Sequence, residues 1–295
     1  MSATFKTVGI FARVTNPSVV DTLKTLISYL QRLQQPFVVD AETAKLLADS
    51  SLTSVPREAL SQRCNLLIVV GGDGSLLHAA HIVINDEIPV LGVNRGRLGF
   101  LTDILPTELK KIEAILQGKF ILEKRFLLTA TVQHQGKIIG QSNALNEVAL
   151  IPASVPHMNE FEIDIDDQFV CSQDSDGLIV ATPTGSTAYA LSGGGPILHP
   201  QLDAIVMVPM FPHTLTIRPI VIEGNRRINI RISPHNTATP RLTCDSQAFI
   251  NTPPGSQIEI QKKSQRLHLI HPIDYDYYET LRSKLYWGRK LTYSE

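Results

Sequence analysis

The chain of 295 residues has few cysteines, no excess of charge of one sign and no long apolar run. Its three cysteines, Cys64, Cys171 and Cys244, are far apart and show neither a CxxC nor a Cys/His spacing. This argues against a disulfide framework and a zinc site, and it favours the reducing cytoplasm. The first residues lack a basic-then-apolar signal pattern. No apolar run approaches the roughly 20 residues that a membrane helix needs.

The charges balance, with 27 basic and 28 acidic residues and a formal net charge of -1. This balance gives no electrostatic reason to expect nucleic acid or an anionic membrane as a partner. At 43% hydrophobic residues, the chain can bury the cores of two ordinary domains. We therefore expect a soluble globular protein that binds neither nucleic acid nor a membrane.

The hydrophobic period changes near residue 126. Before it, expected strands at 6–11, 36–40, 66–70 and 88–93 alternate with helices that start at Asn16-Pro17 and at Thr107, which predicts a parallel sheet covered on both faces. After it, apolar residues alternate with polar ones in short runs, including 258–260 and 267–269, which predicts an all-β domain. Leu281 and Leu285 predict a closing helix that ends near Gly288.

The predicted fold class is therefore α/β plus all-β. We expect a Rossmann-like α/β domain with a parallel sheet over residues 1–122 and a β-sandwich-like domain over 123–272. The C-terminal segment 273–295 is expected to pack back on the N-terminal domain.

The most informative feature is an apolar strand, Leu66–Val70, that runs directly into Gly71-Gly72-Asp73-Gly74-Ser75 and then into residues at helical spacing. The glycines let the backbone approach a ligand closely, and the free N–H groups of a helix start suit a phosphate. A carboxylate at Asp73 would repel that phosphate. The acid therefore predicts proton transfer, or organisation of a metal, beside the phosphate.

Two further segments are candidates for a site. The block Asp176–Pro196 is rich in hydroxyls and glycine; such clusters also occur as plain turns, but its length and its tyrosine favour a nucleotide site. The pair Asn146-Glu147 suits the vicinal hydroxyls of a ribose, although taken alone such a pair is far more often a turn or a solvated edge. Asp164 and Asp166 form a D-x-D that a metal could use, but their spacing on an alternating strand favours a solvated face.

Together these segments resemble the NAD kinase family. The resemblance rests on GGDGS at Gly71–Ser75, G-x-N-x-G-x-L-G-F-L at Gly92–Leu101, N-E at Asn146–Glu147, the long block at Asp176–Pro196 and D-S-Q at Asp245–Gln247. The motifs run in order over most of the chain. A GGDG turn alone also occurs in lipid and sphingosine-type kinases, and the block at Asp176–Pro196 separates the two groups.

The resemblance implies transfer of a phosphoryl group from ATP to the 2′-hydroxyl of the adenosine ribose of NAD, which gives NADP, with Asp73 as the general base. The chain has no Walker lysine, so Mg²⁺ is expected to arrive with ATP and neutralise charge. The resemblance also implies a homodimer or homotetramer with a shared active site.

The same resemblance implies a set of nucleotide-binding residues. They are Gly72, Asp73, Gly74, His78, Asn146, Glu147, His157, Asp174, Asp176, Thr187, Ala188, Tyr189, Ala190, Leu191, Ser192 and Gln247. Asn146 and Glu147 would hold ribose hydroxyls, residues 187–189 would contact the adenosine, and Asp176 and Ser192 would lie near the nicotinamide. Asp174 stands where related bacterial enzymes often carry a basic residue, which leaves the choice between NAD and NADH open.

Two other functions remain alternatives. A lipid or sphingoid-base kinase could share the GGDG loop, although the hydroxyl-rich block argues against an apolar acceptor. A non-catalytic nucleotide sensor would gain nothing from an acid beside a phosphate. A dehydrogenase is disfavoured because no G-x-G-x-x-G follows the first strand.

Overall fold

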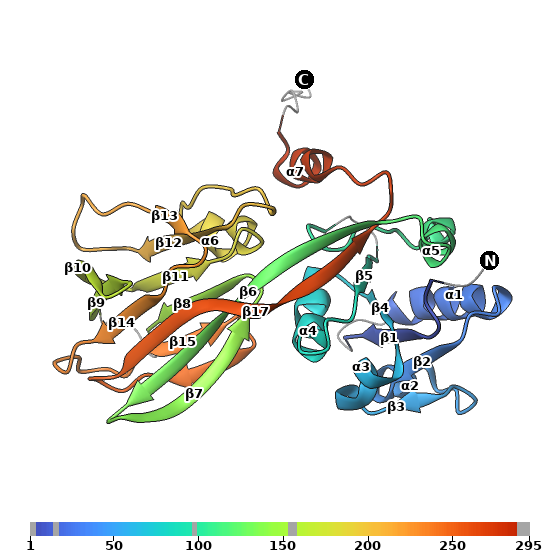
Figure 1. Cartoon of the computed structure of the whole chain (residues 1–295), viewed down its shortest axis with the longest axis horizontal. Coiled ribbons are helices and arrows are strands. Elements are labelled where there is room, and N and C mark those ends of the chain that lie inside the picture. The colour runs from blue at the N-terminus through green and yellow to red at the C-terminus, as the bar shows by residue number, and fades with distance from the viewer. Residues whose placement is uncertain (1–3, 14–17, 96–98, 153–157, 288–295) are drawn as a thin grey trace, which may run out of the picture. The chain divides into compact units, whose positions relative to one another are not determined.

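The computed structural model describes residues 4–13, 18–95, 99–152 and 158–287. The chain divides into two compact units (Figure 1). Unit 1 comprises residues 1–124 and 267–295, and unit 2 comprises residues 125–266, so unit 2 is inserted within the sequence of unit 1. In the part of the chain that is described, no helix is long and apolar enough to cross a membrane.

Unit 1 is an α/β unit. Its elements are β1 (Val8–Ala12), α1 (Ser18–Arg32), β2 (Phe37–Asp40), α2 (Ala41–Leu47), β3 (Ser54–Val55), η1 (Arg57–Ala59), α3 (Leu60–Arg63), β4 (Leu66–Val70), α4 (Asp73–Val83), β5 (Val90–Val93), α5 (Leu109–Leu116) and α7 (Tyr277–Leu285). The end of the long strand β17 (Gln257–His271) also belongs to it.

The sheet of unit 1 is parallel, in the order β17-β5-β4-β1-β2-β3. The chain builds outward from β1 through β2 and β3, then returns to the other side of β1 with β4. The order therefore reverses between β1 and β4, and ligands of open parallel sheets bind outside the carboxyl ends of the strands at such a point. The glycine turn follows β4, at this position.

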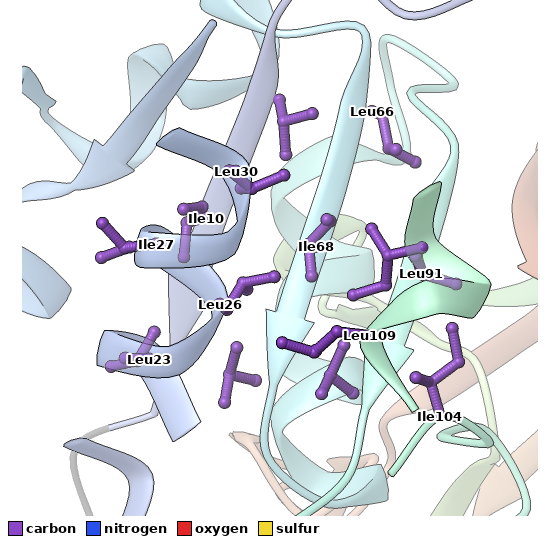
Figure 2. Packing of buried hydrophobic residues seen from close by; sticks show 14 of the residues in the cluster. Ile10, Leu23, Leu26, Ile27, Leu30, Leu66, Ile68, Leu91, Ile104 and Leu109 are labelled. Atoms are coloured by element: carbon purple, nitrogen blue, oxygen red, sulfur yellow. The ribbon is translucent and has the colours of Figure 1, made fainter. Parts of the chain in front are cut away.

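The core of unit 1 follows from the helical periodicity of α1. Leu23, Leu26, Ile27 and Leu30 lie on one face of the helix and pack against the sheet residues Ile10 and Ile68 (Figure 2). On another side of the same core lie Leu91 of β5, Ile104 of the segment between β5 and α5, and Leu109, the first residue of α5 (Figure 2). All five residues of β1 and of β4 are buried, as expected for central strands of a sheet covered on both faces.

Unit 2 is an antiparallel β-sandwich with two short helices. Its elements are most of β6 (Ile121–His134), β7 (Lys137–Ala144), β8 (Glu147–Ile151), β9 (Asn159–Ile165), β10 (Gln168–Ser175), β11 (Gly177–Ala181), η2 (Gly185–Thr187), α6 (Tyr189–Ser192), β12 (Ala204–Met210), β13 (Ile220–Glu223), β14 (Ile228–Ile232), β15 (Arg241–Cys244), β16 (Ala248–Asn251) and the first part of β17.

One sheet of the sandwich has the order β13-β12-β11-β8-β15-β16, and the other contains β10, β9, β14, β17, β6 and β7. Alternate residues of both sheets form the shared core. The opposite face of the six-stranded sheet is covered too, because Ile179 and Ala181 of β11 pack against Ala190 and Leu198. β11 is therefore buried on both faces.

The predicted fold class is confirmed, with local corrections. The helix expected to start at Thr107 begins two residues later: α5 starts at Leu109, and Glu108, not Thr107, is in the N-cap position. The runs 258–260 and 267–269 are not two strands but parts of the 15-residue β17. The predicted helix start at Asn16-Pro17 lies outside the described residues.

Candidate active site

The glycine turn places Asp73 in the first turn of α4, with Gly72 as the N-cap residue. Gly71 has a φ of 156°, and a Cβ there would collide with the Ser75 side chain, so the fold itself requires this glycine. Gly72 and Gly74 differ, because a Cβ on either would meet none of the described atoms within 4 Å. Neither has a positive φ. The packing of the described chain does not explain these two glycines.

The carboxylate of Asp73 is held by the segment that follows β5. Oδ2 accepts the N–H of Phe100 at 2.8 Å, and Oδ1 accepts the N–H of Leu101 at 3.0 Å and the hydroxyl of Thr102 at 3.2 Å. Asn94 in turn donates to the Thr102 hydroxyl at 2.8 Å. A Cβ at Gly99 would collide with Asp73, so this approach requires a glycine. The G-x-N-x-G-x-L-G-F-L segment therefore orients the acid.

His78, one turn further along α4, contacts the end of β1. Its ring stacks on Phe11, with 5.7 Å between centroids. Its Nε2 is 3.2 Å from Nη1 of Arg57. Arg57 also pairs with the fully buried Asp40 at 3.2 Å. His78 thus lies beside the carboxyl ends of β1 and β2, close to the point where the strand order reverses.

In unit 2, Asn146 and Glu147 lie where β8 begins, next to the end of β11. Glu147 pairs with Ala181 in the ladder, and the Asn146 carbonyl accepts the N–H of Thr182 at 2.9 Å. A Cβ at Gly185 would collide with the same carbonyl of Asn146. The N-E pair and the start of the hydroxyl-rich turn are therefore neighbours.

Asp245, in the turn between β15 and β16, holds the backbone at the start of β8, where Asn146 and Glu147 lie. Asp245 and Ser246 have φ values of 51° and 55° and form the tight turn between β15 and β16. The Asp245 carboxylate accepts the N–H groups of Leu145 at 2.7 Å, Asn146 at 2.8 Å and Glu147 at 3.2 Å. This one side chain therefore holds the backbone of the N-E pair together with the bond from Thr182 to the Asn146 carbonyl.

Glu147 is buried, and the pKa of its carboxyl group is raised. Burial, and next the charge of Asp245, raise the pKa of Glu147 to about 7, against the opposing effect of a hydrogen bond from the Tyr189 N–H. Its Oε2 is buried and has no hydrogen-bond partner among the described residues. A buried carboxyl oxygen with spare capacity suits a ligand hydroxyl.

The residues 187–192 form the end of η2 and α6. Tyr189 is 38% exposed, and burial, followed by the charges of Glu147 and Asp176, raises its pKa. Ser192 is exposed as well. A groove of about 690 Å³ runs beside Tyr189 and Ser192, with Pro209, Phe211 and Leu215 in its lining. Ala190 differs from its neighbours, because its side chain is in the core, which leaves only its backbone for a ligand.

The remaining predicted residues are more scattered. Asp174 is exposed on β10, and Asp176 lies just before β11, where its carbonyl accepts the amide of Asn159 at 2.8 Å. Gln247 follows the Asp245-Ser246 turn. His157 lies outside the described residues.

The prediction of a solvated face for the D-x-D pair is wrong for Asp164. This residue is 5% exposed and pairs with Arg231 of β14. Asp166 does lie at the surface, where it accepts the backbone N–H of Arg227 at 2.9 Å. Cross-strand pairing with an arginine, which no local pattern on β9 reveals, accounts for the buried carboxylate.

Sequence reasoning missed several residues that hold Asp73 and the Asn146-Glu147 pair in place. Asn94 belongs to the G-x-N-x-G-x-L-G-F-L motif and Thr102 directly follows it, but spacing alone gives neither residue a role. Asp245 belongs to the noted D-S-Q, and its role depends on backbone N–H groups about a hundred residues earlier. Thr182, whose N–H bonds to Asn146, was part of the long block.

A parallel-sheet unit with an acid at a glycine-rich helix start, in one chain with a β-sandwich, is the arrangement of a nucleotide-dependent phosphotransferase. The family profile described as ATP-NAD kinase N-terminal domain matches residues 8–120, and that described as ATP-NAD kinase C-terminal domain matches residues 145–272. The chain belongs to the NAD kinase family.

Similar proteins agree with this assignment. The chain is 50% identical to an NAD kinase of Ectopseudomonas mendocina over 97% of this chain and 98% of that one. It is 51% identical to an NAD kinase of Cellvibrio japonicus, with 97% and 98% covered. The crystal structure of yeast NADH kinase complexed with NADH superposes with a TM-score of 0.89 at 25% identity, over 98% of this chain and 90% of that one. An Archaeoglobus fulgidus NAD kinase in complex with ATP shares the fold, with a TM-score of 0.75 at 22% identity and coverage of 95% and 98%.

Proposed function

We propose that this chain transfers the γ-phosphoryl group of ATP to the 2′-hydroxyl of the adenosine ribose of NAD, forming NADP, and that Asp73 is the general base. The observation that carries the proposal is the pair of glycines flanking Asp73. Gly72 and Gly74 have ordinary backbone angles and open space where a Cβ would be. Close approach of phosphates to the start of α4 explains them.

The hydrogen bonds of Asp73 suit a base. Its Oδ1 accepts two hydrogen bonds, but its Oδ2 accepts only the N–H of Phe100 among the described residues. A carboxylate oxygen accepts about two hydrogen bonds, so Oδ2 keeps room for one hydroxyl. An alcohol bonded there would be oriented for attack while it loses its proton, and positioning and charge stabilisation supply most of the remaining catalysis.

Unit 2 is proposed to bind NAD. Asn146 and Glu147 would hold ribose hydroxyls, which the unpartnered Oε2 of Glu147 supports. The half-exposed Tyr189 and the segment 187–192 would contact the adenosine. Asp176 and Ser192 would lie toward the nicotinamide, Asp174 would influence the choice between NAD and NADH, and His78, His157 and Gln247 would complete the set.

Mg²⁺ is proposed to enter with ATP. The described residues contain no group of three His, Cys, Asp or Glu side chains that could hold a metal ion by themselves. Mg²⁺ in phosphoryl-transfer sites is usually bound by one or two carboxylates together with the substrate phosphates, so no protein cage is required. When bound, the ion would neutralise charge on the transferring phosphoryl group.

The protein is further proposed to be a homodimer or homotetramer with a shared active site, located in the cytoplasm. Exposed apolar residues next to the predicted NAD-binding segment, Phe211 at 78% and Leu215 at 86%, support a subunit contact. The three free cysteines support a reducing compartment.

The direct test is an assay of the purified protein with ATP, Mg²⁺ and NAD. NADP should form, Asp73→Asn should lower kcat by at least about a hundredfold, and the control Asp21→Asn, at an exposed carboxylate of α1, should match the wild type. Diacylglycerol as acceptor tests the lipid-kinase alternative. Turnover of the lipid but not of NAD, or near-normal activity of Asp73→Asn, would refute the proposal.

A further inference from the structure

Three ionisable side chains that play no part in the proposed site are buried together in unit 1. His271, the last residue of β17, is 1% exposed. Its Nδ1 is 2.7 Å from Oδ2 of Asp103 and its Nε2 is 3.0 Å from Oε2 of Glu123. The ring of Tyr275 stacks on the imidazole, with centroids 3.9 Å apart. We call His271, Asp103 and Glu123 the buried trio.

The geometry of the buried trio favours a protonated histidine. Each ring nitrogen faces a carboxylate oxygen, and both nitrogens donate only in the imidazolium. Burial by itself lowers the pKa of His271, but the hydrogen bonds to Asp103 and Glu123 and their charges outweigh it, so the pKa is raised above its ordinary value.

The trio is connected to Asp73 through three consecutive residues. The donors to the Asp73 carboxylate are Phe100, Leu101 and Thr102, and Asp103 is the next residue along the chain. Ile104 then pairs with Val93 at the end of β5. The segment 100–104 is thus bound to Asp73 at one end and anchored at the other.

His271 is the partner that makes burial of Asp103 tolerable. The second oxygen of Asp103, Oδ1, is buried without a hydrogen-bond partner among the described residues. A buried carboxylate that loses the cation paired with it is strongly unfavourable. Loss of the His271 donor would therefore drive Asp103 toward water and pull on the residues that hold Asp73.

We propose that His271 is a positioning residue for phosphoryl transfer: by holding Asp103, it fixes the 100–102 segment that orients the Asp73 carboxylate. The inference rests on the proposed function and adds a residue from the far end of the chain to it. His271 does not touch the reacting atoms. Displacement of a base by a fraction of an ångström lowers kcat, while substrate binding by other residues is unaffected.

Two amide substitutions separate the two hydrogen bonds of His271. The amide nitrogen of Asn lies close to the position of the imidazole Nδ1, and that of Gln lies close to Nε2. His271→Asn therefore keeps the donor to Asp103 and loses that to Glu123, whereas His271→Gln does the reverse. Both variants lose the positive charge, so a purely structural role predicts similar losses of stability and no difference in kcat.

We expect kcat of His271→Gln to fall about tenfold, with the KM values for NAD and ATP within about twofold of wild type. His271→Asn should retain kcat within about twofold. His268→Gln is the matched control, because His268 lies on the same strand with its Nε2 3.9 Å from Glu87 and is partly exposed. Its kcat should equal that of the wild type.

Equal kcat values for folded Gln and Asn variants, at any level, would overturn the inference. Should His271→Gln fail to fold, Asp103→Ala takes its place: it removes the acceptor through which His271 holds the segment, and kcat should again fall with KM unchanged. Normal kcat in that variant would also overturn the inference. A wild-type protein without NAD kinase activity would overturn the proposed function itself. Equal kcat values in an active enzyme would overturn only the role of His271, so the two failures are distinguishable.

Discussion

The carboxylate of Asp245 accepts the backbone N–H of Glu147 at 3.2 Å, while burial, and next the charge of Asp245, raise the pKa of the Glu147 side chain. One residue therefore fixes the backbone of the predicted ribose-binding pair and makes its neighbouring acid harder to ionise.

Glu147→Gln should change how stability depends on pH. The pKa of Glu147 is about 7 in the folded protein, above its ordinary value of 4.5, so the folded state holds the proton more tightly and Glu147 destabilises the fold as pH rises from 4.5 through 7. The effect reaches at most about 3 kcal/mol. Urea unfolding at pH 5 and pH 8 should show Glu147→Gln gaining on the wild type at pH 8. The exposed Glu160→Gln serves as control, and a difference that stays constant with pH would contradict the prediction.

Asp245→Ala should destabilise unit 2 more than Ser246→Ala. Both residues have a positive φ in the same turn, so the backbone strain is matched. Only Asp245 accepts three backbone N–H groups, and charge-assisted hydrogen bonds contribute about 1.5–3 kcal/mol each when lost alone. We expect a difference of at least about 2 kcal/mol in chemical unfolding, and a raised KM for NAD in the Asp245 variant. Equal stabilities would show that the turn geometry, and not the carboxylate, holds the corner.

Gly72→Ala should impair substrate binding and not stability, whereas Gly185→Ala should impair stability. A Cβ at Gly72 meets open space, whereas one at Gly185 collides with the Asn146 carbonyl. Gly72→Ala should therefore keep the melting temperature but raise the KM for substrate, because the methyl group occupies the path of the phosphates. Gly185→Ala should lower the melting temperature. If Gly72→Ala bound substrate normally, the phosphate assignment would be wrong.

The buried trio predicts a loss of stability at alkaline pH. The pKa of His271 is raised in the fold, so its contribution is fully present below the unfolded value of about 6.5 and is lost as pH rises through the folded value. Unfolding free energies of wild type and His271→Gln should differ most near pH 6 and converge at high pH. A gap that widens with pH would mean that His271 is neutral in the fold.

Much of the fold could be predicted from the sequence because its signals are local. The strand, glycine turn and helix around Asp73 occupy consecutive residues, and the all-β half shows a period of two. The motifs of unit 2 could also be recognised, because each consists of consecutive residues. They meet in space because β8 and β11 are neighbouring strands.

The features that the sequence did not predict have physical causes. β17 was divided because its middle, around Lys262 and Lys263, is polar and hides the continuity of the strand. α2 was missed because Asp40 both ends β2 and caps the helix through the N–H of Thr43, so no turn residue separates them. The anchoring of Asp103 by His271 spans 168 residues. No window along the sequence contains both partners.

The insertion of unit 2 within unit 1 has a consequence for synthesis of the protein. As the chain leaves the ribosome, residues 1–124 appear first, but the parallel sheet still lacks its edge strand and the carboxylate of Asp103 lacks its cation. Both arrive only after the whole sandwich has been made. The nascent α/β half must therefore wait, with a sheet edge open and a carboxylate without its partner, while residues 125–266 are synthesised. During this period, pairing with another nascent chain competes with correct closure.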